Sequence, residues 1–481
     1  MSAELKRLLK FSVGSWITFI FSFIASPITT FLLVPEEFGK FASFILFQTL
    51  AVFLISLGMD QVFMRFYHQS ENKIQLLLKC FFAEVASFVL LIIILLLFSR
   101  YLNYFVTGLN APDDALVVEG SILCLLLSLS NLGLGYIRME NRATRFSVIQ
   151  IGNSLVNYAA FFLILIFFER TYKAFIYASL VSAGFQLIFI YFFPVRIVFK
   201  EWISFFKQRW IMKENLKFGF PFVLAFFVEY IFSNSDRYFL RFFGDFRSLG
   251  IYSLGLRFSS AFNVVQTGFH MYWTPFSYDR YQSNPEDKKF YPKVFDLLNW
   301  GLLTLILLAH SFRELITYII APQYHSVINF FPFLLFTPYL YSLTEITQVG
   351  INFSLRTRLF FWINCITLAV NVIGGYWLIH NFGQMGAALN VAITSFTLFG
   401  LKSFYGNKYY DIMLNWKKFG LSFLSVFLFL TTDLFILMEL KTRLFFLLLN
   451  LIFISSLYLG SIRYLWLLVN GMANARKVQT P

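Results

Sequence analysis

The chain has 481 residues, of which 58% are hydrophobic and 13% are charged, and its formal net charge is +14. Soluble domains carry about 25% charged residues, so this composition excludes a soluble globular protein and indicates a polytopic membrane protein. Nucleic-acid binding requires basic residues clustered on a soluble face. The sequence has no soluble module to carry one, and we predict no nucleic-acid partner.

Apolar runs of about 20 residues mark transmembrane helices, and the sequence predicts about fourteen of them, which makes the fold class all-α. In chain order the runs cover residues 11–33, 38–62, 76–98, 117–137, 147–168, 174–194, 217–240, 249–273, 294–312, 326–352, 358–380, 384–404, 418–438 and 443–467. The seventh and eighth runs are the most polar. The first run follows a basic segment and lacks a cleavage site, which indicates an uncleaved helix rather than a signal peptide.

The distribution of Lys and Arg predicts the orientation of these helices. If the N-terminus lies in the cytosol and the helices alternate, most of the 39 Lys and Arg residues fall in cytosolic loops, as the positive-inside rule requires. The clearest basic loops are 6–10, 138–145, 196–217, 280–293 and 402–418. We therefore predict a multi-pass membrane protein with both termini in the cytosol.

An internal repeat predicts two lobes. Leu9-Lys10-Phe11-Ser12 before the first helix is similar to Leu216-Lys217-Phe218-Gly219, and Phe38-Gly39 is similar to Leu249-Gly250. An even number of helices per half gives parallel repeats related by an axis along the membrane normal. The predicted domains are an N-lobe of six helices (1–194), a cytosolic amphipathic linker (195–216), a C-lobe of six helices (217–404), and two further helices with a cytosolic tail (405–481).

Charged residues inside the apolar runs are candidates for function. Glu229, Ser233 and Asp236 lie on one helical face by their spacing. A carboxylate in a membrane helix costs roughly 2.5–3.5 kcal/mol, so these groups should face protein or a water-filled cavity. They are either a polar clamp between helices or the wall of a transport pathway. Glu84 lies near the start of its helix, and we expect it near the lipid headgroups.

Polar residues at helical spacing form stripes on several predicted helices. Such residues either pack membrane helices together or line a hydrated interior suited to a sugar chain. Arginine would bind a phosphate through two parallel hydrogen bonds, and a buried carboxylate could bind a coupling cation or proton. The candidate cavity residues are Asp236, Arg237, Arg257, Glu229, Asn263, Gln266, His270, Glu345, Asn153 and Asn364, and the candidates for the coupling ion are Glu229, Asp236 and Glu345.

Motifs for catalysis and cofactor binding are missing from the sequence. There is no P-loop, the five His residues are scattered, and the three Cys residues have no C-x-x-C spacing. We therefore predict no enzyme, no catalytic residue, no metal site and no cofactor.

Three motifs resemble the polysaccharide exporter superfamily, specifically the bacterial oligosaccharide-lipid flippases of the Wzx type. They are Val34-Pro35-Glu36-Glu37-Phe38-Gly39, Leu57-Gly58-Met59-Asp60-Gln61, and Asn234-Ser235-Asp236-Arg237-Tyr238-Phe239-Leu240. The resemblance implies two six-helix bundles around a central cavity, plus two C-terminal helices. It also implies an undecaprenyl-diphosphate-linked oligosaccharide of the O-antigen, capsule or exopolysaccharide type as substrate, moved across the bacterial inner membrane by alternating access. No loop is long enough for an ATP-binding domain, so we expect any energy input to come from an ion gradient or from substrate flux. Membrane lipids, a polysaccharide polymerase and a chain-length regulator are the expected partners.

Two other function classes stay open. A multidrug or cation extruder of the same superfamily would need a predominantly acidic pocket, whereas Arg237, Arg241 and Arg257 are close in this sequence. A membrane polymerase or glycosyltransferase generally needs a sizeable extracytoplasmic loop, and the corresponding loops here are short. The flippase hypothesis is therefore the one that the sequence favours.

Overall fold

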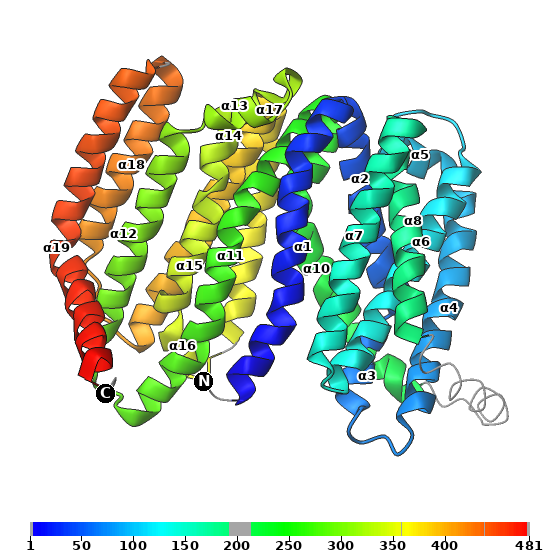
Figure 1. Ribbon diagram of the computed structural model, residues 1–481, viewed down its shortest axis with the longest axis horizontal. Helices are drawn as coiled ribbons and strands as arrows, with labels where there is room; N and C mark the ends of the chain where they lie inside the picture. The colour runs from blue at the N-terminus through cyan, green and yellow to red at the C-terminus, as the bar shows by residue number, and fades with distance from the viewer. Residues whose placement is uncertain (1–2, 192–212, 357, 437, 479–481) are drawn as a thin grey trace. The chain divides into compact units, whose positions relative to one another are not determined.

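The computed structural model describes residues 3–191, 213–356, 358–436 and 438–478, and every regular element in these ranges is a helix (Figure 1). The chain divides into two compact units, Met1–Ser253 and Leu254–Pro481. Most of the predicted amphipathic linker lies outside the described residues, and only its last four residues, 213–216, are seen, as the start of a helix.

The first unit is a bundle in which α6 packs against α2, α4, α7 and α8. Its elements are α1 (Ala3–Leu32), α2 (Pro35–Ser56), α3 (Met59–Phe66), α4 (Lys73–Leu97), α5 (Ser99–Thr107), α6 (Asp114–Met139), α7 (Ala143–Phe167), α8 (Lys173–Tyr191), α10 (Lys213–Phe243) and the beginning of α11 (Phe246–Ser283). Local sequence signals determine where several helices begin. Pro35 is the first residue of α2. The Asn72 side chain caps α4 by accepting hydrogen bonds from two of its backbone N–H groups. The Asp113 carboxylate caps α6 in the same way.

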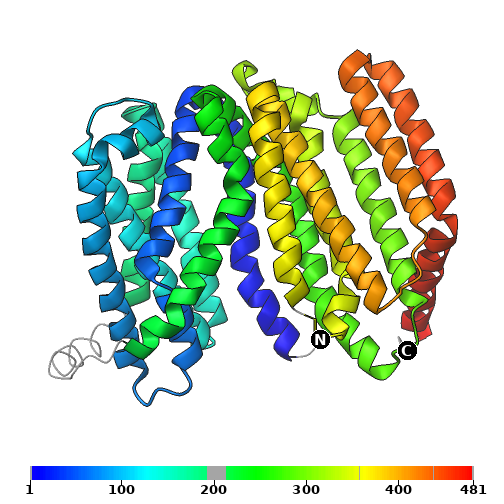
Figure 2. The same ribbon diagram turned by 180° about the vertical axis from the view of Figure 1, so that it is seen from behind.

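The second unit contains the rest of α11 and the C-terminal helices. These are α12 (Phe290–Ser311), α13 (Leu315–Ile319), η1 (Pro322–Tyr324), α14 (Val327–Leu334), α15 (Phe336–Thr347), α16 (Val349–Phe353), α17 (Arg358–Tyr409), α18 (Trp416–Ile436) and α19 (Leu440–Val478). The long α17 turns back at Gly383, whose φ of 52° suits glycine. Its two arms lie side by side, yellow in Figure 2, and Asn390 Nδ2 donates to Asn371 O across them at 3.0 Å.

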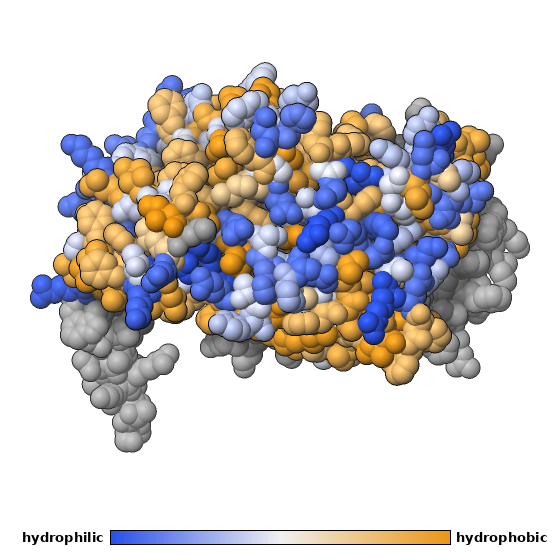
Figure 3. Space-filling model, turned by 90° about the horizontal axis from the view of Figure 1, so that it is seen from above, coloured by the Kyte–Doolittle hydropathy of each residue, from blue (hydrophilic) through white to orange (hydrophobic). Residues whose placement is uncertain are grey.

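Eleven helices in the described ranges are long and apolar enough to cross a membrane. One of them is α17, whose two arms match two predicted spans, and the first and eighth predicted spans correspond to α1 and α11. The predicted all-α polytopic fold is therefore confirmed. An apolar stripe on α1 is exposed, as expected of a face toward lipid: Trp16, Ile20, Ile24, Ile28 and Phe31. Seen from above, hydrophilic residues gather on the helix ends (Figure 3), as expected of ends that leave the membrane.

Two glycines that correspond in the predicted repeat pack reciprocally in the first unit. A Cβ on Gly39 would lie 1.8 Å from Phe246 O, and a Cβ on Gly250 would lie 2.1 Å from Pro35 O. Phe246 and Pro35 each precede their own glycine by four residues, so the contact has an approximate two-fold relation. Only glycine allows helix backbones to approach so closely. The reciprocity supports the internal repeat.

The observed boundary between the units differs from the predicted lobe boundary, because α10 packs on α2 and α3. Tyr230 OH donates to Leu46 O at 2.7 Å, and Gly58 and Gly219 lie in backbone contact near the start of α10. The contact division falls within α11, whereas the sequence predicts a division at 195–216. The assignment of 217–404 to one lobe stays a prediction.

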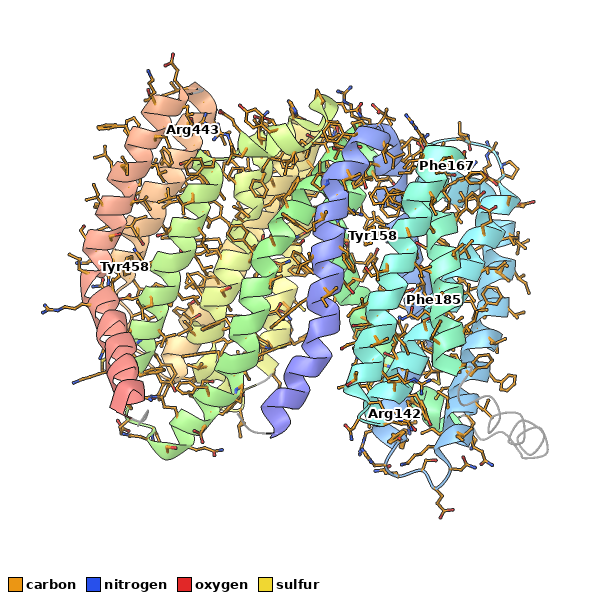
Figure 4. All side chains as sticks on the ribbon, viewed as in Figure 1. Arg142, Tyr158, Phe167, Phe185, Arg443 and Tyr458 are labelled. Atoms are coloured by element: carbon orange, nitrogen blue, oxygen red, sulfur yellow. The ribbon has the colours of Figure 1, made fainter. Side chains whose placement is uncertain are left out.

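The two last helices of the second unit are joined to α12 by polar contacts at three levels. At one end Lys418 Nζ donates to Asp296 Oδ2 at 2.5 Å. In the middle, the fully buried Asn299 donates to Tyr458 OH at 2.6 Å and accepts from Tyr339 OH at 2.6 Å. Figure 4 labels Tyr458 along α19. The predicted C-terminal pair of helices is therefore part of the packed second unit.

At the third level lies a buried charge cluster, defined here as His310, Arg313, Glu314, Asp433 and Arg443. Asp433 is fully buried and accepts from Arg313 Nη1, from His310 Nε2 at 2.8 Å and from Arg443 Nε at 3.0 Å. Arg443, labelled near the start of α19 in Figure 4, also pairs with Glu314 at 2.7 Å. The two buried arginines are balanced by one buried carboxylate, Asp433, and one exposed carboxylate, Glu314.

Candidate functional site

The α10–α11 region places Asp236 inside the first unit. Its side chain is 4% exposed, and Oδ2 accepts a hydrogen bond from the hydroxyl of the fully buried Tyr252. The adjacent Arg237 is half-buried, and its Nε is buried without a partner among the described residues. Asp236 therefore lies inside the protein, as the cost of a charge in lipid predicts.

Arg241, one turn further along α10, ties this helix to the end of α5. Its Nε donates to Phe105 O at 2.6 Å, and Nη2 donates to Tyr104 O. Its guanidinium also lies 4.3 Å from the centre of the Phe246 ring. A carbonyl oxygen at a helix end has a lone pair available for a guanidinium, so this arginine has a structural role.

The residues predicted to share one face of α10 differ in burial. Glu229 and Ser233 are exposed, whereas Asp236 is buried. Arg257, on α11 in the second unit, is half-buried.

The second unit brings together two predicted residues from different helices. His270 Nδ1 on α11 lies 3.1 Å from Glu345 Oε2 on α15, and Gln348 Nε2 donates to the same oxygen at 2.8 Å. The buried Trp273 donates its indole N–H to Glu345 O at 3.0 Å, which fixes α11 against α15. The His270 side chain is 53% exposed, so this His270–Glu345–Gln348 cluster reaches the surface of the unit.

The polar stripe on α11 continues from this cluster. Asn263, Thr267 and His270 are exposed and Gln266 is half-buried. Spacings of three and four residues place the exposed members on one helical face. This face offers an amide, a hydroxyl and an imidazole, which are groups that hydrogen-bond to sugar hydroxyls.

The stripes on the fifth and eleventh predicted helices have a mixed outcome. On α7, Asn157 donates to Ser182 on α8 at 3.0 Å, which is a packing role. Asn153 is half-buried, and its Oδ1 is buried without a partner among the described residues. Asn364 on α17 is exposed. The structure thus assigns packing to some of these amides and leaves others available.

The sequence profile of the family described as "Polysaccharide biosynthesis protein" matches residues 5–277. The chain belongs to this family. No curated protein sequence gives a significant match.

Solved structures share the fold of this polysaccharide biosynthesis protein. The lipid II flippase MurJ in an inward closed conformation is 13% identical, with 94% of this chain and 99% of MurJ covered at a TM-score of 0.66. An inward-facing multidrug resistance transporter of the MATE family and MOP superfamily is 16% identical, with 85% and 94% covered at 0.54. A Vibrio cholerae MATE transporter is 12% identical, with 84% and 95% covered at 0.52. At these identities the likeness establishes the fold.

The family match covers only part of the predicted site. Asp236, Arg257 and His270 lie within residues 5–277, whereas Glu345 and Asn364 lie beyond them. Within the described residues of this family member, no group of three His, Cys, Asp or Glu side chains is placed to hold a metal ion.

Glu84, which we expected near the lipid headgroups, is a buried acid in the structure. It is fully buried on α4, and its Oε2 accepts from Ser128 Oγ on α6 at 2.7 Å. Its Oε1 is buried without a partner in the described part of the chain. The sequence signal for this buried acid was its position inside an apolar run.

Proposed function

We propose that this protein is a flippase that translocates an undecaprenyl-diphosphate-linked oligosaccharide across the bacterial inner membrane by alternating access, with both termini in the cytosol. The observation that carries the proposal is the pairing of a polysaccharide biosynthesis family match with a fold shared, over 94% of the chain, with a lipid II flippase. Translocation breaks no covalent bond, so the proposal assigns no catalytic residue.

The proposed substrate has two chemically different parts, and the candidate residues divide between them. Arg237 and Arg257 would bind the diphosphate, because a guanidinium donates two parallel hydrogen bonds to phosphate oxygens. The amides of Asn153, Asn263 and Gln266 would hydrogen-bond to the sugar. The exposed polar face of α11 supports this part of the proposal most directly.

Coupling to an ion gradient requires an acid that gains and loses a cation. Glu345 is the best candidate, because His270 and Gln348 both contact one of its oxygens while the cluster stays open to the surface. Asp236 and Glu229 are the other candidates. Asp236 is held by Tyr252 within the first unit.

The test is a deletion strain in which lipid-linked sugars are profiled in each leaflet. The flippase proposal expects the lipid-linked unit to accumulate facing the cytosol and surface polysaccharide to be lost. Finding the unit already in the periplasmic leaflet of the deletion strain would refute it. Complementation with Arg257→Ala should fail to restore export although the protein still inserts into the membrane. Arg257→Lys keeps the charge but loses the two parallel N–H donors of the guanidinium, so it should restore export only in part.

A multidrug or cation extruder is the second candidate, because two MATE transporters share the fold. It expects altered drug sensitivity in the deletion strain with normal surface polysaccharide. The same strain therefore distinguishes the two functions.

A further inference from the structure

A groove of about 530 Å³ lies where α17 ends and α18 begins in the second unit. It is lined by Gly400, Ser403, Phe404, Asn407, Lys408, Asp411 and Trp416. Its size falls within the range of small-molecule sites, roughly 300–1,000 Å³. The groove belongs to the loop 402–418, which the positive-inside rule places at the cytosolic face.

One half of the groove continues an apolar face of α17. Ile393, Phe396, Gly400 and Phe404 are exposed at spacings of three and four residues, so they form a single stripe along the helix. A Cβ added to Gly400 would meet no atom within 4 Å, so the missing side chain leaves open space. An exposed apolar stripe with a channel at a glycine suits an acyl chain lying against the helix.

The other half of the groove carries both signs of charge. Lys408 and Asp411 are exposed, and within the described residues they form no ion pair with each other or with another side chain. Asp411 Oδ1 accepts from Met413 N at 2.9 Å, which holds its carboxylate in place. The amide oxygen of Asn407 is buried without a hydrogen-bond partner in this part of the structure.

These groups match a zwitterion in both sign and hydrogen bonding. Lys408 donates to a phosphate, whereas the Asp411 carboxylate and the Asn407 oxygen only accept and therefore need a donor such as a primary ammonium. A buried acceptor without a partner costs free energy, and an ammonium group at this position would satisfy it. A headgroup with negative charge alone would instead meet the carboxylate of Asp411.

We propose that the groove between α17 and α18 is a binding site for a phospholipid with a phosphoethanolamine headgroup. Lys408 binds the phosphate, Asp411 and Asn407 bind the ammonium, and the acyl chain follows the stripe through Gly400 and Phe404. Trp416, 39% exposed, forms the wall at the height of the headgroups, where tryptophan is enriched in membrane proteins. The site does not depend on the substrate of the proposed flippase.

The test measures lipids retained by the purified full-length protein. The protein is incubated in detergent with equal amounts of phosphatidylethanolamine, phosphatidylglycerol and phosphatidylcholine with identical acyl chains, and bound lipid is counted by native mass spectrometry. We expect phosphatidylethanolamine to be retained about tenfold more than either competitor, since one charge-assisted hydrogen bond is lost with each. Phosphatidylcholine matters because its quaternary ammonium keeps the charge but cannot donate a hydrogen bond.

Three variants probe the three parts of the groove. Asp411→Asn should reduce the preference over phosphatidylglycerol to about parity, Lys408→Met should lower retention of all three lipids, and Gly400→Leu should abolish retention by filling the groove.

Two control variants match these changes outside the groove. Gly420→Leu alters a glycine on α18 that is equally exposed and open, and Lys417→Met removes a neighbouring exposed cation. Both should retain phosphatidylethanolamine like the unchanged protein. Equal retention of all three lipids by the unchanged protein would overturn the proposal, as would Gly400→Leu retaining as much lipid as Gly420→Leu. If Gly400→Leu fails to fold, the Asp411→Asn result decides alone.

Discussion

Replacing Asp433 by Asn tests how the last two helices are held to α12. Asp433 is fully buried and accepts hydrogen bonds from His310, Arg313 and Arg443, both arginines being 3% exposed. The amide would keep the shape of the side chain but remove its charge. Arg443 would keep Glu314 at 2.7 Å as a counter-charge, whereas Arg313 would lose its carboxylate partner.

The expected loss follows from which cation is left buried and unpaired. Breaking a buried ion pair by removing one partner costs about 3–5 kcal/mol, and the oxygen that Asn retains places this variant near the lower end, at about 3 kcal/mol. Glu314→Gln is the matched control, because the Glu314 side chain is 48% exposed and such a pair contributes only about 0–1 kcal/mol. Each change removes one negative charge from the same cluster, so the two variants differ in whether the lost carboxylate is buried or exposed.

Thermal unfolding of the purified variants at fixed detergent and lipid measures the difference. Asp433→Asn should lower the midpoint clearly, and Glu314→Gln should leave it nearly unchanged. Adding Arg313→Met to Asp433→Asn should recover much of the loss, since no unpaired buried charge then remains. Equal losses from Asp433→Asn and Glu314→Gln, or a double variant whose loss is the sum of both single losses, would refute the reasoning.

Three further changes have defined outcomes. Gly250→Ala would place a Cβ 2.1 Å from a backbone oxygen of α2 and should abolish the yield of monodisperse protein, whereas Gly420→Ala, with open space at its Cβ, should not. Glu84→Ala should lower the unfolding midpoint by an amount equivalent to about 1–3 kcal/mol, because the Ser128 hydroxyl loses its acceptor. Glu84→Gln keeps an acceptor and should lower the midpoint less. Equal losses from the two variants would contradict this account. His270→Ala should reduce export in the complementation assay while leaving the unfolding midpoint unchanged, because this side chain is 53% exposed, and a lowered midpoint would indicate a packing role instead.

The reciprocal glycines show how far a sequence pattern can reach. Gly39 and Gly250 were aligned only by a weak repeat, yet each lies against the backbone of the other's segment. A close helix crossing requires glycine at the contact, so this requirement can be recognised in the sequence. The same cannot be said of the partner atoms, Phe246 O and Pro35 O, because any residue supplies a carbonyl oxygen.

Charged residues inside helices show where the sequence stops being sufficient. Spacing placed Glu229 and Asp236 on one face, but one is exposed and the other is bound by Tyr252. Glu84 was expected near the headgroups and is fully buried against Ser128. Helical periodicity gives the direction in which a side chain points around the helix axis. The residue that this side chain contacts depends on how a second helix packs against the first.

The sequence alone determined that this chain is an all-helical membrane protein with about fourteen spans, because an apolar helix satisfies its own backbone hydrogen bonds and needs no partner to be recognised. Only the tertiary structure decided which polar side chains meet: His270 with Glu345, and Asp433 with His310 and Arg313. These contacts join residues far apart in the chain, and their geometry is set by the packing of helices rather than by any local pattern.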